Sequence, residues 1–294
     1  MKEFKVSVDD RSVMVMVRDA GDARGVPVVH FHGTPGSRLE PGFGDEIARH
    51  LGIRVISFDR PGYGQSGAAV SSLQRVARDV EAIVDELGIA VFATFGWSGG
   101  GPFALAAAAA MPGRVTRVGV SGGLAPTQEM PNARDALTQN DISALSYLPD
   151  DPTRSAESFR QGNEELLDAM MGVRDDEQAP WIDWMWGESD PKIVGDETVR
   201  QALHGSFREA LRQGPMAIAW DNVAFIGPWG FDLAEVKSPV RLWYGDRDQM
   251  TPVANGRWLQ RHLPEAELVV YHDGGHLLPL EHWAEMLQAV TAGD

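Results

Sequence analysis

Two Gly-x-Ser-x-Gly pentapeptides, centred on Ser98 and on Ser121, are the first candidates for chemistry in this sequence. A serine hydroxyl becomes a nucleophile when a base removes its proton, and a sharp turn between a strand and a helix exposes it for attack. The apolar run 91–95 predicts a strand before Ser98, and the run 103–111 predicts a helix after it. Ser121 follows a strand-like run but leads into irregular sequence. We therefore predict that Ser98 is the nucleophile and that Ser121 lies in a strand-end turn.

A histidine and an aspartate near the end of the chain fit the roles of base and orienting carboxylate. Of the eight histidines, His276 follows a Gly-Gly pair after the last predicted strand, where its ring can reach back over the sheet. The preceding strand, 240–244, leads into a loop with Asp246 and Asp248. Asp246 directly follows a glycine and is expected to pair locally, so we predict that Asp248 holds the histidine tautomer and stabilises the imidazolium. The chain order Ser98, Asp248, His276 is one of those that such triads adopt.

The oxyanion that forms during acyl transfer needs two N–H donors that are already in place. Gly99 directly follows the predicted nucleophile at the start of a helix, and its N–H can supply one of them. The second is expected from the loop 32–36, which follows the apolar run 28–31. Pro35 has no N–H to give, so we predict the N–H of Thr34 as the second donor.

These residues share one location in the pattern of predicted elements, the turn that follows an apolar strand. Short apolar runs alternate with longer helical stretches at both ends of the chain. Strands that are apolar throughout are typical of a parallel sheet covered on both faces. A hairpin of strands 4–8 and 13–17, joined at 9–11, is expected before them. The other predicted strands are 28–31, 54–58, 91–95, 115–120, 240–244 and 268–271.

The alternating pattern stops between residues 125 and 237, which predicts a helical cap inserted into an α/β core of residues 1–124 and 238–294. The segment holds five of the nine tryptophans. This apolar bulk exceeds what a connection needs, so we expect part of it to form a small core and part to close a pocket above the nucleophile. Trp97 is expected to pack beneath the site. The predicted substrate contacts are Trp181, Trp184, Trp186 and Trp220.

Composition narrows the classes of partner and cofactor. The chain has 294 residues, a formal net charge of −16 and no cysteine. The lack of cysteine excludes disulfides, thiolate metal ligands and a cysteine nucleophile, and the negative charge disfavours nucleic acids and anionic membranes as partners. No His-Glu-x-x-His motif occurs and no Gly-x-Gly-x-x-Gly turn opens the first strand–helix unit, so neither a metal nor a cofactor is predicted. Without a signal-peptide pattern or a bilayer-length apolar stretch, a cytoplasmic protein is expected.

Five motifs together resemble the successive signatures of the α/β-hydrolase superfamily. They are His-Gly-Thr-Pro-Gly-Ser at 32–37, Asp-Arg-Pro-Gly-Tyr-Gly-Gln-Ser at 59–66, Gly-Trp-Ser-Gly-Gly at 96–100, Gly-Asp-Arg-Asp at 245–248 and Gly-His at 275–276. The resemblance covers both ends of the chain and leaves the inserted segment uncovered. It implies an eight-stranded, mostly parallel sheet with helices on both faces and a helical cap inserted. It also implies a triad at the C-terminal ends of the strands and an acyl-enzyme formed without a cofactor.

These features favour a serine hydrolase whose partner is a small to medium, hydrophobic carboxylic ester or lactone, reached by movement of the cap. A carbon–carbon bond hydrolase with the same triad is an alternative, and a thioesterase or amidase also fits. The loop 32–36 is similar to that of proline iminopeptidases, whose nucleophile context usually reads Gly-Gly-Ser-Trp-Gly. In such an aminopeptidase, Glu188 and Asp190 would bind the amino terminus of the substrate. A non-catalytic, ligand-binding member of the fold is the alternative from another class.

Overall fold

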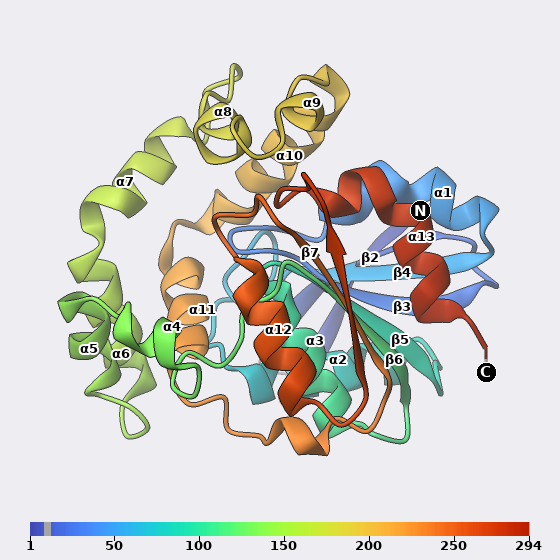
Figure 1. Cartoon of the computed structure of the whole chain (residues 1–294), viewed down its shortest axis with the longest axis horizontal. Helices are drawn as coiled ribbons and strands as arrows, with labels where there is room; N and C mark the ends of the chain where they lie inside the picture. The colour runs from blue at the N-terminus through green and yellow to red at the C-terminus, as the bar shows by residue number, and fades with distance from the viewer. Residues whose placement is uncertain (9–12, 294) are drawn as a thin grey trace.

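A single eight-stranded sheet forms the centre of the computed structural model, which describes residues 1–8 and 13–293 (Figure 1). The strand order is β1-β2-β4-β3-β5-β6-β7-β8. β2 pairs antiparallel with β1 and β4, and the remaining neighbours are parallel, as expected from the sequence. The turn predicted at 9–11 lies outside the described residues. The strands are β1 (Lys2–Val8), β2 (Val13–Gly21), β3 (Val26–Phe31), β4 (Ile53–Phe58), β5 (Phe92–Trp97), β6 (Val115–Ser121), β7 (Val240–Gly245) and β8 (Ala266–Tyr271).

Helices cover both faces of this sheet, which explains why its central strands are apolar throughout. In β3, Val29 and Phe31 belong to one buried cluster with α2 and α3, whereas Val28 belongs to the cluster on the other face, with α1 and α13. This division follows from the alternation of side chains along a strand. The core helices are α1 (Asp45–His50), α2 (Leu73–Glu86), α3 (Gly100–Ala110), α12 (Val253–His262) and α13 (Leu278–Thr291), and a 3₁₀ turn, η1 (Glu40–Gly44), precedes α1.

Residues 125–237, between β6 and β7, are built of helices and are called the insertion below (Figure 1). Part of it packs on itself, because Phe159, Trp220 and Val223 form a separate buried cluster with small alanines. Other parts of the insertion contact the core loops that follow β3 and β8. Its helices are α4 (Pro131–Asp135), α5 (Gln139–Leu145), α6 (Pro152–Gly162), α7 (Glu164–Val173), α8 (Trp181–Trp186), α9 (Pro191–Val194), α10 (Glu197–Ala210) and α11 (Met216–Ile226), with 3₁₀ turns η2 (Leu211–Gln213) and η3 (Leu233–Glu235).

A helix that crosses a bilayer must be long and mainly apolar. Across residues 1–8 and 13–293, the structure contains no helix whose length and apolar character would let it span a bilayer.

Candidate active site

Ser98 occupies a strained turn between β5 and α3. Its φ of 54° lies in the left-handed region, which a residue with a side chain seldom adopts and which is typical of a nucleophile elbow. The turn needs glycines on both sides: a Cβ on Gly96 would lie 2.4 Å from the Gly100 carbonyl oxygen, and one on Gly100 would lie 2.0 Å from the Phe31 carbonyl oxygen. The Ser98 N–H donates to the carbonyl oxygen of Ser121 at 2.8 Å, which ties the elbow to the end of β6.

Asp248 and His276 form a buried pair at the ends of β7 and β8. The Asp248 Oδ2 lies 2.7 Å from His276 Nδ1, and the two residues are 5% and 4% exposed. The backbone N–H groups of Met250 and Thr251 donate to Asp248 Oδ1, and the Thr251 hydroxyl donates to Oδ2 at 2.8 Å. Burial alone would raise the pKa of Asp248, but the attraction of His276 and the hydrogen bonds from His276 and Thr251 outweigh it and lower that pKa below its ordinary value. The pair is therefore arranged to keep a carboxylate beside the imidazole.

Gly122 allows this pair to approach β6. Its φ is 55°, and a Cβ built on it would lie 3.1 Å from Thr251 Oγ1 and 3.3 Å from both Asp248 Oδ2 and His276 Nδ1. Such distances are tighter than ordinary van der Waals contact, so any side chain here would press on the Asp–His hydrogen bond.

The loop after β3 brings Thr34 next to Gly99. A Cβ on Gly99 would lie 2.6 Å from Thr34 Oγ1, and both residues line a cavity with Ser98. The neighbouring Gly33 N–H donates to Glu40 Oε1 at 2.9 Å, and Glu40 Oε2 lies 2.7 Å from His30 Nε2. The Glu40 carboxylate, which also lines the smaller cavity at Ser98, thus holds the backbone of this loop.

A buried ion pair holds the same loop from the other side. Arg60 and Asp221 are both 0% exposed, and an Arg60 guanidinium nitrogen lies 2.5 Å from Asp221 Oδ2. That oxygen also accepts hydrogen bonds from the hydroxyls of Thr34 and Tyr63, each at 2.8 Å. Arg60 further donates to the carbonyl oxygen of Gly33 at 3.0 Å. Asp221 belongs to α11, so the insertion directly fixes the loop that carries the predicted oxyanion donor.

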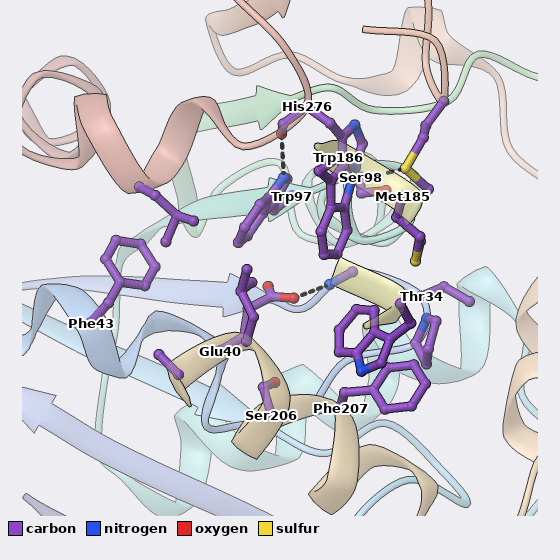
Figure 2. A pocket seen from close by; sticks show the side chains of 17 residues that line it. Thr34, Glu40, Phe43, Trp97, Ser98, Met185, Trp186, Ser206, Phe207 and His276 are labelled. Atoms are coloured by element: carbon purple, nitrogen blue, oxygen red, sulfur yellow. Dashed lines mark hydrogen bonds between the residues drawn. The ribbon is translucent and has the colours of Figure 1, made fainter. Parts of the chain in front are cut away.

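Two cavities meet at Ser98, and both are lined mainly by apolar side chains. Figure 2 shows the smaller of the two. The smaller cavity, about 650 Å³ with its mouth, also has Trp97, Trp186, His276 and Glu40 in its wall. The larger cavity, about 1210 Å³ with its mouth, extends between α7, α8 and α11. Shared by both walls are Thr34, Pro35, Ser98, Trp181, Met185, Phe207 and Met250. Among the described residues that line either cavity, none is lysine or arginine.

The four tryptophans predicted to contact substrate differ in position. Trp181 lines both cavities, Trp186 lines the smaller one, and Trp184, which is 73% exposed, lines the larger one. Trp220 lines neither cavity; its ring packs in the insertion's own cluster, so its assignment as a substrate contact is not supported by the structure. Trp97 is buried in a core cluster with residues of β3, β4 and α13; its ring also lines the smaller cavity, and its Nε1 donates to the His276 carbonyl oxygen at 3.1 Å.

Three other residues that the sequence offers as candidates for roles at the site, Asp246, Ser121 and Asp190, do not line the cavities at Ser98. Asp246 pairs with His272 at 2.6 Å, which lowers the pKa of this exposed aspartate. The Ser121 hydroxyl is buried and lines neither cavity. Asp190 is also buried, and it accepts hydrogen bonds from the backbone N–H groups of His276 and Leu277 instead of facing a cavity at Ser98.

Sequence reasoning missed the roles of Asp190 and Asp221 in holding the site. Asp221 does carry a signal, since it is the sole charged residue within the apolar stretch of α11. Asp190 carries a misleading one, because an aspartate before Pro191 predicts a side-chain cap on the helix that begins there, and Asp190 makes no hydrogen bond of that kind. Over the described part of the chain, no group of three or more histidine, cysteine, aspartate or glutamate side chains is placed to hold a metal ion.

Comparison with known proteins shows the family to which this chain belongs. Residues 26–282 match the model of the alpha/beta hydrolase fold. A 2-hydroxy-6-oxononadienedioate/2-hydroxy-6-oxononatrienedioate hydrolase of Klebsiella pneumoniae is 26% identical, over 94% of this chain and 90% of the relative. Among solved structures, an esterase from Exiguobacterium antarcticum (TM-score 0.71, 19% identity, 99% and 100% of the two chains) and an enol-lactonase from Burkholderia xenovorans (TM-score 0.64, 18% identity, 98% and 99%) share the fold. The chain therefore belongs to the alpha/beta hydrolase fold family and is an enzyme of the hydrolase class.

Proposed function

We propose that this enzyme hydrolyses uncharged carboxylic esters or lactones with apolar substituents, through an acyl-enzyme on Ser98. The observation that carries the proposal is the wall of the two cavities at Ser98: apolar and aromatic side chains form most of it, and no lysine or arginine is present among its described residues. Binding to such a wall is favourable for a substrate that buries apolar surface against it. The wall offers no cation to pair with a carboxylate.

In the proposed mechanism, His276 Nε2 takes the proton of the Ser98 hydroxyl as the oxygen attacks the ester carbonyl carbon. The hydrogen bond to Asp248 holds the proton on His276 Nδ1 and stabilises the imidazolium. The N–H groups of Thr34 and Gly99 stabilise the oxyanion. The imidazolium then gives its proton to the oxygen of the leaving alcohol. In the second half of the reaction, His276 takes a proton from a water molecule whose oxygen attacks the carbonyl carbon of the acyl-enzyme, and the imidazolium returns a proton to Ser98 as the acid leaves.

The insertion acts in this proposal as the cap, with residues 1–124 and 238–294 as the core. Its side chains close the cavities over Ser98: Trp181 and Trp186 from α8, and Phe207 from α10. Exclusion of water strengthens the electrostatic stabilisation of the oxyanion and the imidazolium. Trp184, at the exposed edge of the larger cavity, marks where an apolar substituent enters.

Hydrolysis of a carbon–carbon bond next to a carbonyl is the second candidate, because the curated relatives are named for dienedioate and trienedioate substrates. Those compounds have two carboxylates. The described cavity walls here provide no cation for them, and the smaller cavity holds the carboxyl group of Glu40. This difference in charge favours the ester or lactone over the dicarboxylate.

A substrate panel tests the proposal. It comprises p-nitrophenyl esters of increasing acyl length, phenyl acetate, simple lactones, 2-hydroxy-6-oxononadienedioate and an aminoacyl p-nitroanilide. Because each buried methylene contributes about 0.8 kcal/mol, kcat/KM should rise roughly fourfold per methylene until the cavity is full. Activity should vanish in Ser98→Ala. A preference for the dienedioate or for the aminoacyl compound would contradict the proposal.

A further inference from the structure

The carboxylate of Asp190, in the insertion, holds the backbone of the loop that carries His276. Its Oδ2 accepts the His276 N–H at 2.9 Å and its Oδ1 accepts the Leu277 N–H at 3.2 Å. The Ser189 hydroxyl donates to Oδ2 at 2.6 Å. Asp190 is 4% exposed, so these three neutral donors replace the water that a carboxylate normally binds.

This arrangement is not the ordinary use of an aspartate at a helix start. Asp190 precedes α9 and Asp196 precedes α10, and each stands at the position from which a side chain normally caps its own helix. Asp196 does so, because its Oδ1 accepts the N–H groups of Thr198 and Val199. Asp190 makes no such bond to α9 and points instead at the core.

Gly275 is shaped to receive this carboxylate. A Cβ on Gly275 would have three Asp190 atoms as its nearest neighbours, at 2.2 Å (Oδ2), 2.3 Å (Cγ) and 2.4 Å (Oδ1). Gly275 is not among the residues with positive φ, so its backbone would accept alanine. The glycine is therefore required by the approach of Asp190 and not by its own conformation.

The same part of the insertion also contacts the imidazole ring. The rings of Trp186 and His276 are parallel within 6°, with centroids 6.4 Å apart. Trp186 Nε1 lies 3.1 Å from Met250 Sδ, in the loop that carries Asp248. Residues 186–190 thus touch His276 on its ring and on its backbone, whereas Asp190 itself lines neither cavity at Ser98.

We propose that Asp190 is a positioning residue that fixes His276 for proton transfer and makes the competence of the histidine depend on the closed position of the insertion. The proposal rests on the proposed function of His276 as base. If the insertion lifts at α8 and α9, the Asp190 bonds break and the His276 loop loses two of its anchors. Proton transfer is therefore available only when the insertion also shields Ser98 from bulk solvent, and the one water molecule that hydrolyses the acyl-enzyme is then activated inside the closed site.

The charge of Asp190 has a second consequence. Its carboxylate is bonded to the N–H of the residue that becomes an imidazolium during the reaction. A negative charge at this place stabilises the protonated ring, so its removal should move the acidic limb of the kcat/KM profile to lower pH. A role confined to helix stability would leave that limb in place.

The experiment compares Asp190→Asn and Asp190→Ala with Asp196→Ala, a matched loss of an aspartate that binds two backbone N–H groups in the same insertion. With p-nitrophenyl butyrate, we expect kcat to fall on the order of 10²-fold in Asp190→Ala, with KM changed by less than about twofold. Asp190→Asn keeps the shape and one acceptor oxygen, so it should lose less kcat and show the shifted acidic limb. Asp196→Ala should lower the stability of the protein and leave both kcat and the acidic limb of the kcat/KM profile unchanged.

A double-mutant cycle with Gly275→Ala completes the test. The alanine should lower kcat strongly when Asp190 is present and much less when Asp190 is alanine, because the clashing carboxylate is gone. Additive effects, or Asp190 variants with the kcat and pH limb of the wild type, would overturn the inference. A wild-type enzyme without Ser98-dependent hydrolysis would instead overturn the proposed function, so the two failures are distinct. If Asp190→Ala does not fold, Asp190→Asn and Gly275→Ala still test the inference.

Discussion

The Thr34 hydroxyl donates a 2.8 Å hydrogen bond to Asp221, a residue of the insertion 187 positions further along the chain. The same carboxylate oxygen neutralises the buried Arg60. One carboxylate therefore joins the insertion, the Arg60 loop and the loop of the proposed oxyanion donor. Because these contacts are buried, they should contribute to stability as well as to activity.

Replacing Asp221 by asparagine should destabilise the protein strongly. The substitution leaves the Arg60 guanidinium buried without its anion, a loss that typically costs about 3–5 kcal/mol. Urea unfolding followed by tryptophan fluorescence measures the change. Glu46→Gln is the control, since it breaks an ion pair with Arg49 whose two side chains are 75% and 51% exposed, and it should leave the unfolding midpoint nearly unchanged. Equal midpoints for the two variants would refute the assigned role of Asp221.

Gly122→Ala should lower kcat, because the new Cβ would press on the hydrogen bond between Asp248 and His276. A displacement of reacting groups by about 1 Å can cost on the order of 10² in rate. Gly88→Ala is the matched control: its φ is 65°, and a Cβ there would meet nothing within 4 Å. Both alanines carry a backbone cost of roughly 1–2 kcal/mol. Steady-state kinetics should separate them, and a full kcat in Gly122→Ala would show that the pair tolerates displacement.

His32 should make stability depend on pH. It is buried, its Nδ1 lies 2.7 Å from the Gly33 carbonyl oxygen, and its Nε2 accepts the Arg60 N–H at 3.3 Å. Burial first, and then the charge of Arg60, hold the pKa of His32 well below its ordinary value of 6.5. Below pH 6.5 the unfolded chain therefore binds a proton that the folded chain does not, and the free energy of unfolding falls as the pH falls.

Urea unfolding at several pH values between neutrality and pH ~5 measures this dependence, in the wild type and in His32→Gln. One proton corresponds to a slope of up to ~1.4 kcal/mol per pH unit, and the glutamine variant should lack that part of the slope. Identical slopes in the two proteins would show that His32 is not the group responsible. The comparison cancels the contributions of the other titrating groups, because both proteins contain them.

The parallel core could be predicted because each strand repeats the same local pattern. The run 91–95 predicts the strand that the structure has as β5 (Phe92–Trp97), and the glycines around Ser98 predict the elbow that follows it. Asp248 lies further into its loop than Asp246, and this position likewise predicts that Asp248 is the aspartate that contacts His276. These inferences depend on residues close together in the chain, where alternation and turn geometry are strong constraints.

Contacts between the insertion and the core could not be predicted in this way. Trp220 and Asp221 are adjacent in α11, so they project about 100° apart: the tryptophan packs in the insertion's cluster and the aspartate reaches Arg60. Trp97 lines the smaller cavity, and its indole N–H donates to the carbonyl oxygen of a residue 179 positions away. No local pattern reports such partners, since they depend on how the insertion packs on the core.

Covalent labelling of Ser98 tests the central claim most directly. The wild-type enzyme, Ser98→Ala and Ser121→Ala are incubated with a fluorophosphonate, and intact mass and peptide mapping locate the adduct. An activated serine attacks the phosphorus and displaces fluoride, so we expect one adduct, on Ser98, in the wild type and in Ser121→Ala, and none in Ser98→Ala. Turnover of p-nitrophenyl butyrate should fall by ~10⁴-fold or more in the same variant. An unlabelled wild type, or an adduct that persists in Ser98→Ala, would contradict the account.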